Sequence, residues 1–252
     1  ILSTLKFWGS YLIPIDITRY CLSKPDLNLE PVLLKFTKTL KFVSFYQKFL
    51  IEPEHKANRT NDALRAGLVQ IVRHLFELEH GAFDRYSASS AVESGNLECL
   101  KFVHEHGGEW GNFVMFAAAK NGFLDCLKYA HENGCPSTFT VSFEAAREGR
   151  LECLKYIFEQ KIPIHAKTAD IAAHMGHLEC MIYAHQHGCF LNNSIMTEAS
   201  RNGHLNVIKY AHEHGCGWHD ATACVAAVRG GHLDVLKYLR DVKYPWCDDL
   251  IN

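Results

Sequence analysis

The stretch Gly122-Phe123-Leu124-Asp125-Cys126-Leu127-Lys128-Tyr129-Ala130-His131-Glu132-Asn133-Gly134-Cys135 decides the fold, because its pattern returns along most of the chain. An alanine stands four residues before a glycine seven times, and successive glycines are separated by 28, 27, 27, 27, 27 and 28 residues. These glycines are Gly67, Gly95, Gly122, Gly149, Gly176, Gly203 and Gly231. A fixed period of this length is typical of a protein built from stacked structural repeats.

Each repeat is predicted to contain two helices. Leu124, Cys126, Leu127 and Ala130 fall at helical spacing, and Gly134 suits the left-handed end of that helix. A shorter segment with small residues precedes each turn glycine, with paired alanines in three repeats (Ala118-Ala119, Ala145-Ala146 and Ala172-Ala173), and small residues let two helices approach closely. We therefore expect an all-α solenoid of about seven helix-turn-helix repeats of 27–28 residues, spanning residues 58–252, with the last repeat cut off.

Three blocks carry a family resemblance. Gly176-His177-Leu178-Glu179-Cys180, Gly203-His204-Leu205-Asn206-Val207 and Gly231-His232-Leu233-Asp234-Val235 resemble the opening of the second helix of the ankyrin repeat. The preceding Ala145-Ala146-Arg147-Glu148-Gly149 is similar to the end of its first helix. More narrowly, the Leu-Lys-Tyr-Ala-His-Glu-Asn-Gly-Cys block resembles short ankyrin repeats of giant DNA viruses of amoebae and of protists.

The repeat departs from that family in two ways. Its period is about six residues shorter than the usual 33, and the Thr-Pro-Leu-His tetrapeptide is absent, with Thr140-Val141-Ser142-Phe143 in one of its places. We therefore expect the projecting hairpins of the family to be reduced to tight loops. The period also fits a leucine-rich repeat, but the helical spacing of the block argues against a strand-forming one.

Residues 1–57 do not follow the repeat and are expected to form a helical cap on the first repeat. Pro31 suits the first turn of a helix, and the apolar residues that follow it are spaced for an amphipathic one. The alternative is a degenerate F-box-like segment, because Tyr11 to Ile17 and the following Pro25-Asp26-Leu27 faintly resemble an F-box opening.

Four of the ten cysteines occupy the same position in successive repeats, as Cys99, Cys126, Cys153 and Cys180. Stacked helices lie about 8–10 Å apart, which is too far for a disulfide, whose Cα atoms lie within about 4.4–6.8 Å. Val207 and Val235 fill the position in the next two repeats, which indicates a small buried apolar side chain. We therefore expect free thiols and a reducing, cytoplasmic compartment (host cytoplasm or a virion if the source is viral).

Composition and spacing argue against catalysis, cofactors and metal. The sixteen histidines recur once per layer instead of converging, and no nucleophile motif or phosphate-binding loop is present. The formal net charge of −2 creates no field that favours nucleic acid, and no apolar run is long enough to span a membrane. Lysines and acids four residues apart, such as Lys128 and Glu132, predict ion pairs along an exposed helix face.

Aromatic residues provide two further expectations. Trp110, Trp218 and Trp246 share a column with Ile164 and Leu191 and are predicted to pack inward from loops. Phe113, Phe116 and Phe143, in contrast, stand at positions where other repeats have polar residues, which indicates an exposed first-helix face. Its candidate partner-binding residues are Phe113, Phe116, Phe143, Asp170 and Thr197.

Together, the resemblance and the periodicity predict a scaffold that binds another protein through its first helices and short loops. The resemblance implies rigid surface complementarity and no chemical step. One alternative is an adaptor that recruits substrates to a ubiquitin ligase, with residues 1–57 docking on the ligase. Another is a structural component of a viral particle or other large assembly.

Overall fold

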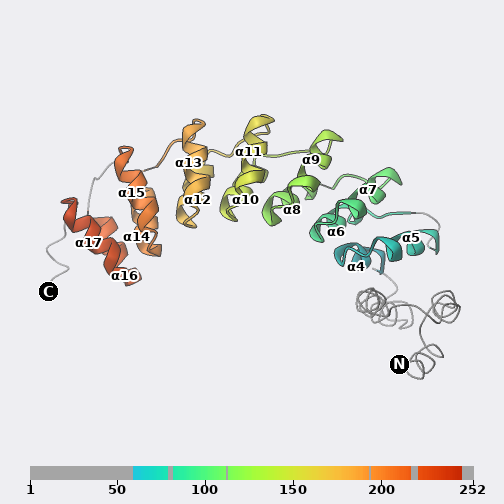
Figure 1. The fold of residues 1–252 in the computed structure, drawn as a ribbon, viewed down its shortest axis with the longest axis horizontal. Helices are drawn as coiled ribbons and strands as arrows, with labels where there is room; N and C mark the ends of the chain where they lie inside the picture. The colour runs from blue at the N-terminus through green and yellow to red at the C-terminus, as the bar shows by residue number, and fades with distance from the viewer. Residues whose placement is uncertain (1–58, 79–81, 112, 193, 217–220, 246–252) are drawn as a thin grey trace, which may run out of the picture. The chain divides into compact units, whose positions relative to one another are not determined.

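The computed structural model describes residues 59–78, 82–111, 113–192, 194–216 and 221–245. The chain divides into two compact units, residues 1–63 and 64–252. The predicted cap or F-box-like segment, residues 1–57, lies outside the described residues. The rest of the fold concerns the second unit and helix α4 (Arg59–Arg65), which crosses the boundary between the units. Each repeat contributes two helices (Figure 1).

The described residues form fourteen helices and no strands. The first helices of the repeats are α4 (Arg59–Arg65), α6 (Ser87–Glu93), α8 (Val114–Asn121), α10 (Thr140–Arg147), α12 (Thr168–His174), α14 (Ser194–Asn202) and α16 (Thr222–Gly230). The second helices are α5 (Val69–Leu78), α7 (Leu97–Glu105), α9 (Leu124–Glu132), α11 (Leu151–Glu159), α13 (Leu178–Gln186), α15 (Leu205–Glu213) and α17 (Leu233–Asp241). The predicted all-helical repeat architecture is confirmed, and the described parts of the loops between repeats contain no hairpin strands.

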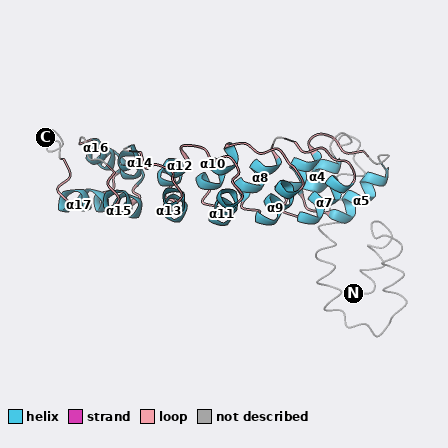
Figure 2. Cartoon of the chain, turned by 90° about the horizontal axis from the view of Figure 1, so that it is seen from above, coloured by secondary structure: helices cyan, strands magenta, loops and turns pink. Residues whose placement is uncertain are grey.

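First helices pack on first helices and second helices on second helices. Contacts run from α6 through α8, α10, α12 and α14 to α16, and a second series runs from α5 through α7, α9 and α11 to α13. Figure 2 shows the even-numbered helices α10 to α16 along one side and the odd-numbered helices α11 to α17 along the other. None of the described helices is long and apolar enough to cross a membrane.

The repeated alanine and the repeated cysteine both lie in the core. Ala118, Ala145 and their five counterparts are completely inaccessible to solvent, which permits the close approach of the two helices of a repeat. Cys99 and Cys126 are at most 1 % exposed, and so is Val207, which replaces cysteine. All eight described cysteines are free thiols, so this column behaves as an apolar one.

The glycine between the two helices has a left-handed backbone in all seven repeats, with φ between 68° and 79°. The residue that follows the turn glycine of one repeat packs against the turn glycine of the repeat before it. A Cβ atom on Gly176 would lie 2.7 Å from the ring of His204, and one on Gly203 would lie 2.5 Å from the ring of His232. Glycine is therefore required here for backbone conformation and for space.

Hydrogen bonds accompany this packing between neighbouring repeats. Nε2 of His204 bonds to the carbonyl oxygen of His174 at 3.0 Å, and Nε2 of His232 bonds to that of Arg201 at 3.0 Å. Arg150 Nε donates to the carbonyl of Lys120 in the same way at 3.1 Å. These side chains satisfy carbonyls that a helix end leaves without an intrahelical partner. The histidine of the Gly-His-Leu block thus joins one repeat to the previous one.

The second helices end in another left-handed turn. Gly107, Gly134, Gly188 and Gly215 adopt it as predicted, with φ between 77° and 93°. Lys161 and Lys243 occupy the same position in two other repeats, with φ of 54° and 55°. The turn tolerates lysine because a Cβ atom on the four glycines would meet no atom within 4 Å.

The repeated leucine after the turn glycine is less buried than its helical spacing suggests. Leu97, Leu124, Leu151, Leu178 and Leu205 are half-buried, and Leu233 is 62 % exposed. Each leucine is the first residue of its second helix, where side chains lie between neighbouring turns instead of in the centre of the core. Two of these leucines, Leu178 and Leu205, line an open groove between neighbouring repeats.

The predicted ion pairs between residues four apart are wrong for the described part of the chain. Lys155 instead pairs with Glu152 at 2.8 Å. Lys101 and Lys128 place their ammonium groups over the rings of Tyr129 and Tyr156 in the next repeat, each 5.8 Å from the ring centroid. A neighbouring repeat therefore provides the lysine with a partner that the pattern of one helix cannot reveal.

Candidate protein-interaction surface

The predicted site begins on α8, where Phe113 and Phe116 lie together. Phe113 immediately precedes the helix and is 66 % exposed, whereas Phe116 is half-buried one turn later. Their ring centroids are 6.2 Å apart in an edge-to-face arrangement. Such a pair is favourable by about 0.5–1.5 kcal/mol beyond its buried area. The half-buried ring thus supports the exposed one.

The same arrangement recurs on α10 with different supports. Phe139 immediately precedes this helix and is 52 % exposed, and Phe143 lies half-buried one turn later. Both rings contact the imidazole of His165, at centroid distances of 5.2 and 5.1 Å. Because α8 packs against α10, the two helices place four aromatic rings on neighbouring repeats.

The other two predicted residues, Asp170 and Thr197, form hydrogen bonds with the next repeat. Asp170 on α12 accepts a hydrogen bond from the backbone nitrogen of Asn192 at 3.2 Å, and burial raises the pKa of its carboxyl group. Thr197 on α14 shares a hydrogen bond of 3.0 Å with Thr222. Both side chains are half-buried. They lie on the same face as the phenylalanines, but part of their polar capacity is used within the array.

Tyr86 and Phe139 extend the predicted set and were missed by the sequence analysis. Tyr86 immediately precedes α6 and is 54 % exposed, with the guanidinium of Arg85 4.9 Å from its ring centroid. An exposed aromatic residue therefore precedes the first helix in three consecutive repeats, as Tyr86, Phe113 and Phe139. The signal was present in the sequence as an aromatic residue just before α6, α8 and α10. It was obscured because Phe139 is displaced by one residue from the period of 27.

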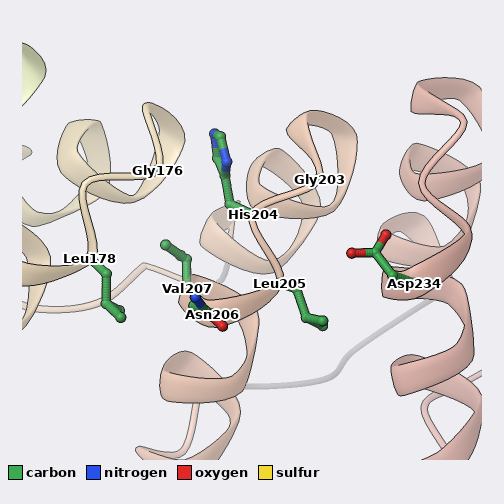
Figure 3. Close-up of a pocket in the computed structure, with 8 residues that line it drawn as sticks. All are labelled: Gly176, Leu178, Gly203, His204, Leu205, Asn206, Val207 and Asp234. Carbon is green, nitrogen blue, oxygen red and sulfur yellow. The ribbon is translucent and has the colours of Figure 1, made fainter.

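An open groove of about 420 Å³ lies elsewhere, between the turns that precede α13, α15 and α17. Figure 3 shows the side chains of Leu178 and Leu205 pointing to one side of the turn and His204 to the other, with Asp234 approaching from α17. The remaining lining residues are Gly176, Gly203, Asn206 and Val207. His204 is already bonded to the preceding repeat. The groove is part of the stacking interface between repeats, and its lining contains no nucleophile–base pair.

Comparison with known proteins agrees with this geometry. Residues 88–168 match the family model for ankyrin repeats, in three copies. The chain contains ankyrin repeats. The crystal structure of the human ASB11 ankyrin repeat domain is similar to it with a TM-score of 0.56 and 16 % sequence identity, covering 68 % of this chain and 96 % of that one. In all, 126 chains of solved structures match, whereas no curated protein sequence does.

The histidines of these ankyrin repeats have structural roles. His187 and His214 each use Nδ1 to bond the backbone carbonyl four residues earlier, at 2.8 Å, and so cap the end of the second helix. Another set bonds the tyrosine hydroxyl of the next repeat at 2.7–3.0 Å, in the pairs His104–Tyr129, His131–Tyr156, His185–Tyr210 and His212–Tyr238. Within the described ranges, no group of three or more histidine, cysteine, aspartate or glutamate side chains could hold a metal ion.

Of the three tryptophans in the predicted column, Trp110 alone lies among the described residues. Trp110 is half-buried and stacks on His104 with centroids 4.4 Å apart, and its Nε1 donates to the carbonyl of Asn133 at 3.0 Å. Its partners in the column, Ile164 and Leu191, are also half-buried. Trp218 and Trp246 lie outside the described residues. The loop tryptophan thus packs against the next repeat.

Proposed function

We propose that this protein is a non-catalytic scaffold that binds another protein through the face formed by its first helices and the short loops before them. The observation that carries the proposal is the exposure of an aromatic residue before α6, α8 and α10, as Tyr86, Phe113 and Phe139. Ankyrin repeats are typically interaction modules, and aromatic residues dominate the energy of many protein interfaces. Neighbouring exposed apolar rings mark an interaction surface more strongly than scattered ones.

The predicted residues divide this face into two parts. Phe113, Phe116 and Phe143 offer apolar area in the early repeats, and Asp170 and Thr197 offer polar groups in the later ones. A partner that spans several repeats would use apolar contacts at one end and hydrogen bonds at the other. The free, buried thiols of the repeats support a reducing compartment such as the cytoplasm.

Two finer proposals follow from residues 1–57 and from the repeat sequence. An adaptor for a ubiquitin ligase would use residues 1–57, so purification with a Skp1-like protein should depend on that segment. A structural role in a particle, together with the resemblance to giant-virus repeats, would place the chain in such a particle in stoichiometric amounts. Neither role has a specific observation in the described residues, so the scaffold function is preferred.

Site-specific photocrosslinking tests the scaffold function. A benzophenone amino acid replaces Phe113 in one variant and Glu132, on the opposite helix layer, in a matched control. We expect a partner protein to be crosslinked from position 113 only. The purified partner should then bind the wild type at least ~30-fold more tightly than Phe113→Ser, since loss of a hot-spot side chain costs about 2 kcal/mol or more. Equal crosslinking from both positions, or equal affinity for the variant, would contradict the proposal.

A further inference from the structure

Three exposed or half-buried side chains follow the same order at the start of and along each of the helices α8 and α10. On α8 the order is Phe113, Phe116 and then Lys120, and on α10 it is Phe139, Phe143 and then Arg147. Successive members are three or four residues apart, so they lie on one side of the helix. Each helix thus presents two aromatic rings followed by a cation. We call these six side chains the α8–α10 stripe.

The two cations of the stripe differ in their partners. Arg147 bonds Glu144 at 3.1 Å and Glu148 at 2.9 Å, so its charge is neutralised within α10 and its cap. Lys120 has no carboxylate within ion-pair distance among the described residues, and its side chain is half-buried. The stripe therefore combines exposed aromatic area with a cation, Lys120, that forms no ion pair; it acts on the carboxyl group of Glu144 only through space, where it opposes the rise in pKa that burial causes.

The other first helices do not repeat this combination. On α12 the corresponding residues are Asp170 and His174, and on α14 they are Thr197 and Arg201. Glu198 lies 2.7 Å from Arg201, whose charge it neutralises, and 3.4 Å from Nδ1 of His174. Among these four helices, exposed apolar area therefore coincides with a cation outside any ion pair only on α8 and α10.

We infer that the α8–α10 stripe binds a peptide segment of a partner protein that carries bulky apolar side chains and a carboxylate. The inference rests on the proposed scaffold function and adds the chemistry of the partner. Apolar side chains cover Phe113 and Phe139, and the carboxylate pairs with the ammonium group of Lys120. Charge complementarity at a partly buried site gives specificity as well as association rate.

The charges favour a peptide over single-stranded nucleic acid, which also stacks on aromatic rings. From α8 to α14, the first helices and their ends carry Lys120, Arg147 and Arg201 beside the acids Glu144, Glu148, Asp170 and Glu198. A polyphosphate backbone needs a continuous track of cations free of ion pairs. This face offers one cation without an ion pair next to its rings, which suits a single carboxylate.

Fluorescence anisotropy with labelled peptides tests the inference. The probes are three series of fluorescein-labelled peptides that share two leucine anchors at graded spacings and carry glutamate, serine or lysine between them. We expect wild-type protein to prefer the glutamate series over the lysine series by at least ~10-fold, and Lys120→Glu to reverse that order. Lys237→Glu, which makes the same charge change on α17, should keep the wild-type order.

Several results would overturn the inference: no binding by any series, no preference for glutamate, equal effects of Lys120→Glu and Lys237→Glu, or displacement of the peptides by oligothymidylate. Phe139→Ser provides a second check, since it should weaken all series while circular dichroism shows retained helix. If crosslinking from position 113 succeeds but the acidic preference is absent, the scaffold function stands and this inference fails. If crosslinking also fails, both proposals fall.

Discussion

Each repeat contains two left-handed turns, and a comparison of the two shows that the same backbone conformation restricts the choice of residue to different degrees. The turn between the two helices always uses glycine, and in Gly203 a Cβ atom would meet the ring of His232 at 2.5 Å. The turn after the second helix uses glycine in some repeats and lysine in others, and a Cβ atom on Gly134 would meet nothing within 4 Å. Space as well as conformation therefore selects the residue in the first turn, and conformation alone selects it in the second.

The largest effect is expected for Gly203→Ala. The alanine must adopt an unfavourable left-handed backbone conformation. Its Cβ atom must also displace the ring of His232 from its hydrogen bond to the carbonyl oxygen of Arg201. We expect the free energy of unfolding to fall by roughly 2–3 kcal/mol, the sum of the left-handed cost and of one lost hydrogen bond. Urea denaturation followed by circular dichroism measures this change. A loss below that of Gly134→Ala would show that the ring contact is unimportant.

Gly134→Ala should have an intermediate effect. Its φ is 77°, but its Cβ would enter open space, so only the conformational cost applies. We expect a loss of about 1 kcal/mol, because alanine is strained in this region. The same urea titration gives the value, and Gly134→Asn serves as its control because asparagine tolerates this conformation better. Equal losses for alanine and asparagine would contradict the conformational explanation.

Lys161→Gly tests the same turn in the opposite direction. Lys161 has a φ of 54° at the position where four other repeats have glycine. Relief of this strain should outweigh the greater flexibility of glycine in the unfolded chain, for a net stabilisation of roughly 0.5–1 kcal/mol. A rise in thermal midpoint in differential scanning calorimetry would support this, with Lys155→Gly as a destabilising helix control. A fall in the midpoint of Lys161→Gly would be contrary to it.

His204→Gln should have the smallest effect, on the pH dependence of stability. Burial of the imidazole lowers the pKa of His204 below 6.5, and the nearby His174, His177 and His232 lower it further, although the bond to the carbonyl of His174 opposes the shift. A lowered pKa means that the unfolded chain binds the proton more readily. The stability from this group is therefore complete above pH 6.5 and is lost as the pH falls through the folded-state pKa.

Glutamine keeps a hydrogen-bond donor but does not titrate, so the difference in unfolding free energy between wild type and His204→Gln should shrink or reverse as the medium is acidified from neutral pH. Urea titrations at several pH values measure this difference, and added salt reduces the contribution of the neighbouring histidines. Parallel curves for the two proteins across the acidic range would rule out a shifted His204.

The period in the sequence predicted the contacts within a repeat much better than the contacts between repeats. Gly122 and Gly134 indicated two turns, and Cys126 and Ala130 indicated the buried face, because these signals depend on residues close together in the chain. The pairs His104–Tyr129 and Lys101–Tyr129 join residues 25 and 28 positions apart. Such spacings acquire meaning only when the repeats are stacked.

Only part of the candidate surface could be predicted from the sequence, because several of its contacts also join neighbouring repeats. Variation between polar and aromatic residues predicted an exposed first-helix face, because exposed positions tolerate both kinds of side chain; Phe113 is 66 % exposed there and Phe116 is half-buried, and their role in binding stays a prediction. The support of Phe143 by His165 and the bond between Asp170 and Asn192 could not be inferred, since each depends on a loop of the next repeat. Tyr86 and Phe139 required the helix boundaries that the structure provides.

The column of buried cysteines has a consequence for the study of motion in this array. Burial raises the pKa of Cys99 to about 12 and those of Cys126, Cys153 and Cys180 to about 11, so each thiol reacts only when its repeat opens. Four consecutive repeats thus each contain a buried thiol at an equivalent position, and the rate at which it reacts reports how often that repeat opens. Pulsed alkylation followed by peptide mass spectrometry would time each opening separately and map local stability along the solenoid without any engineered label.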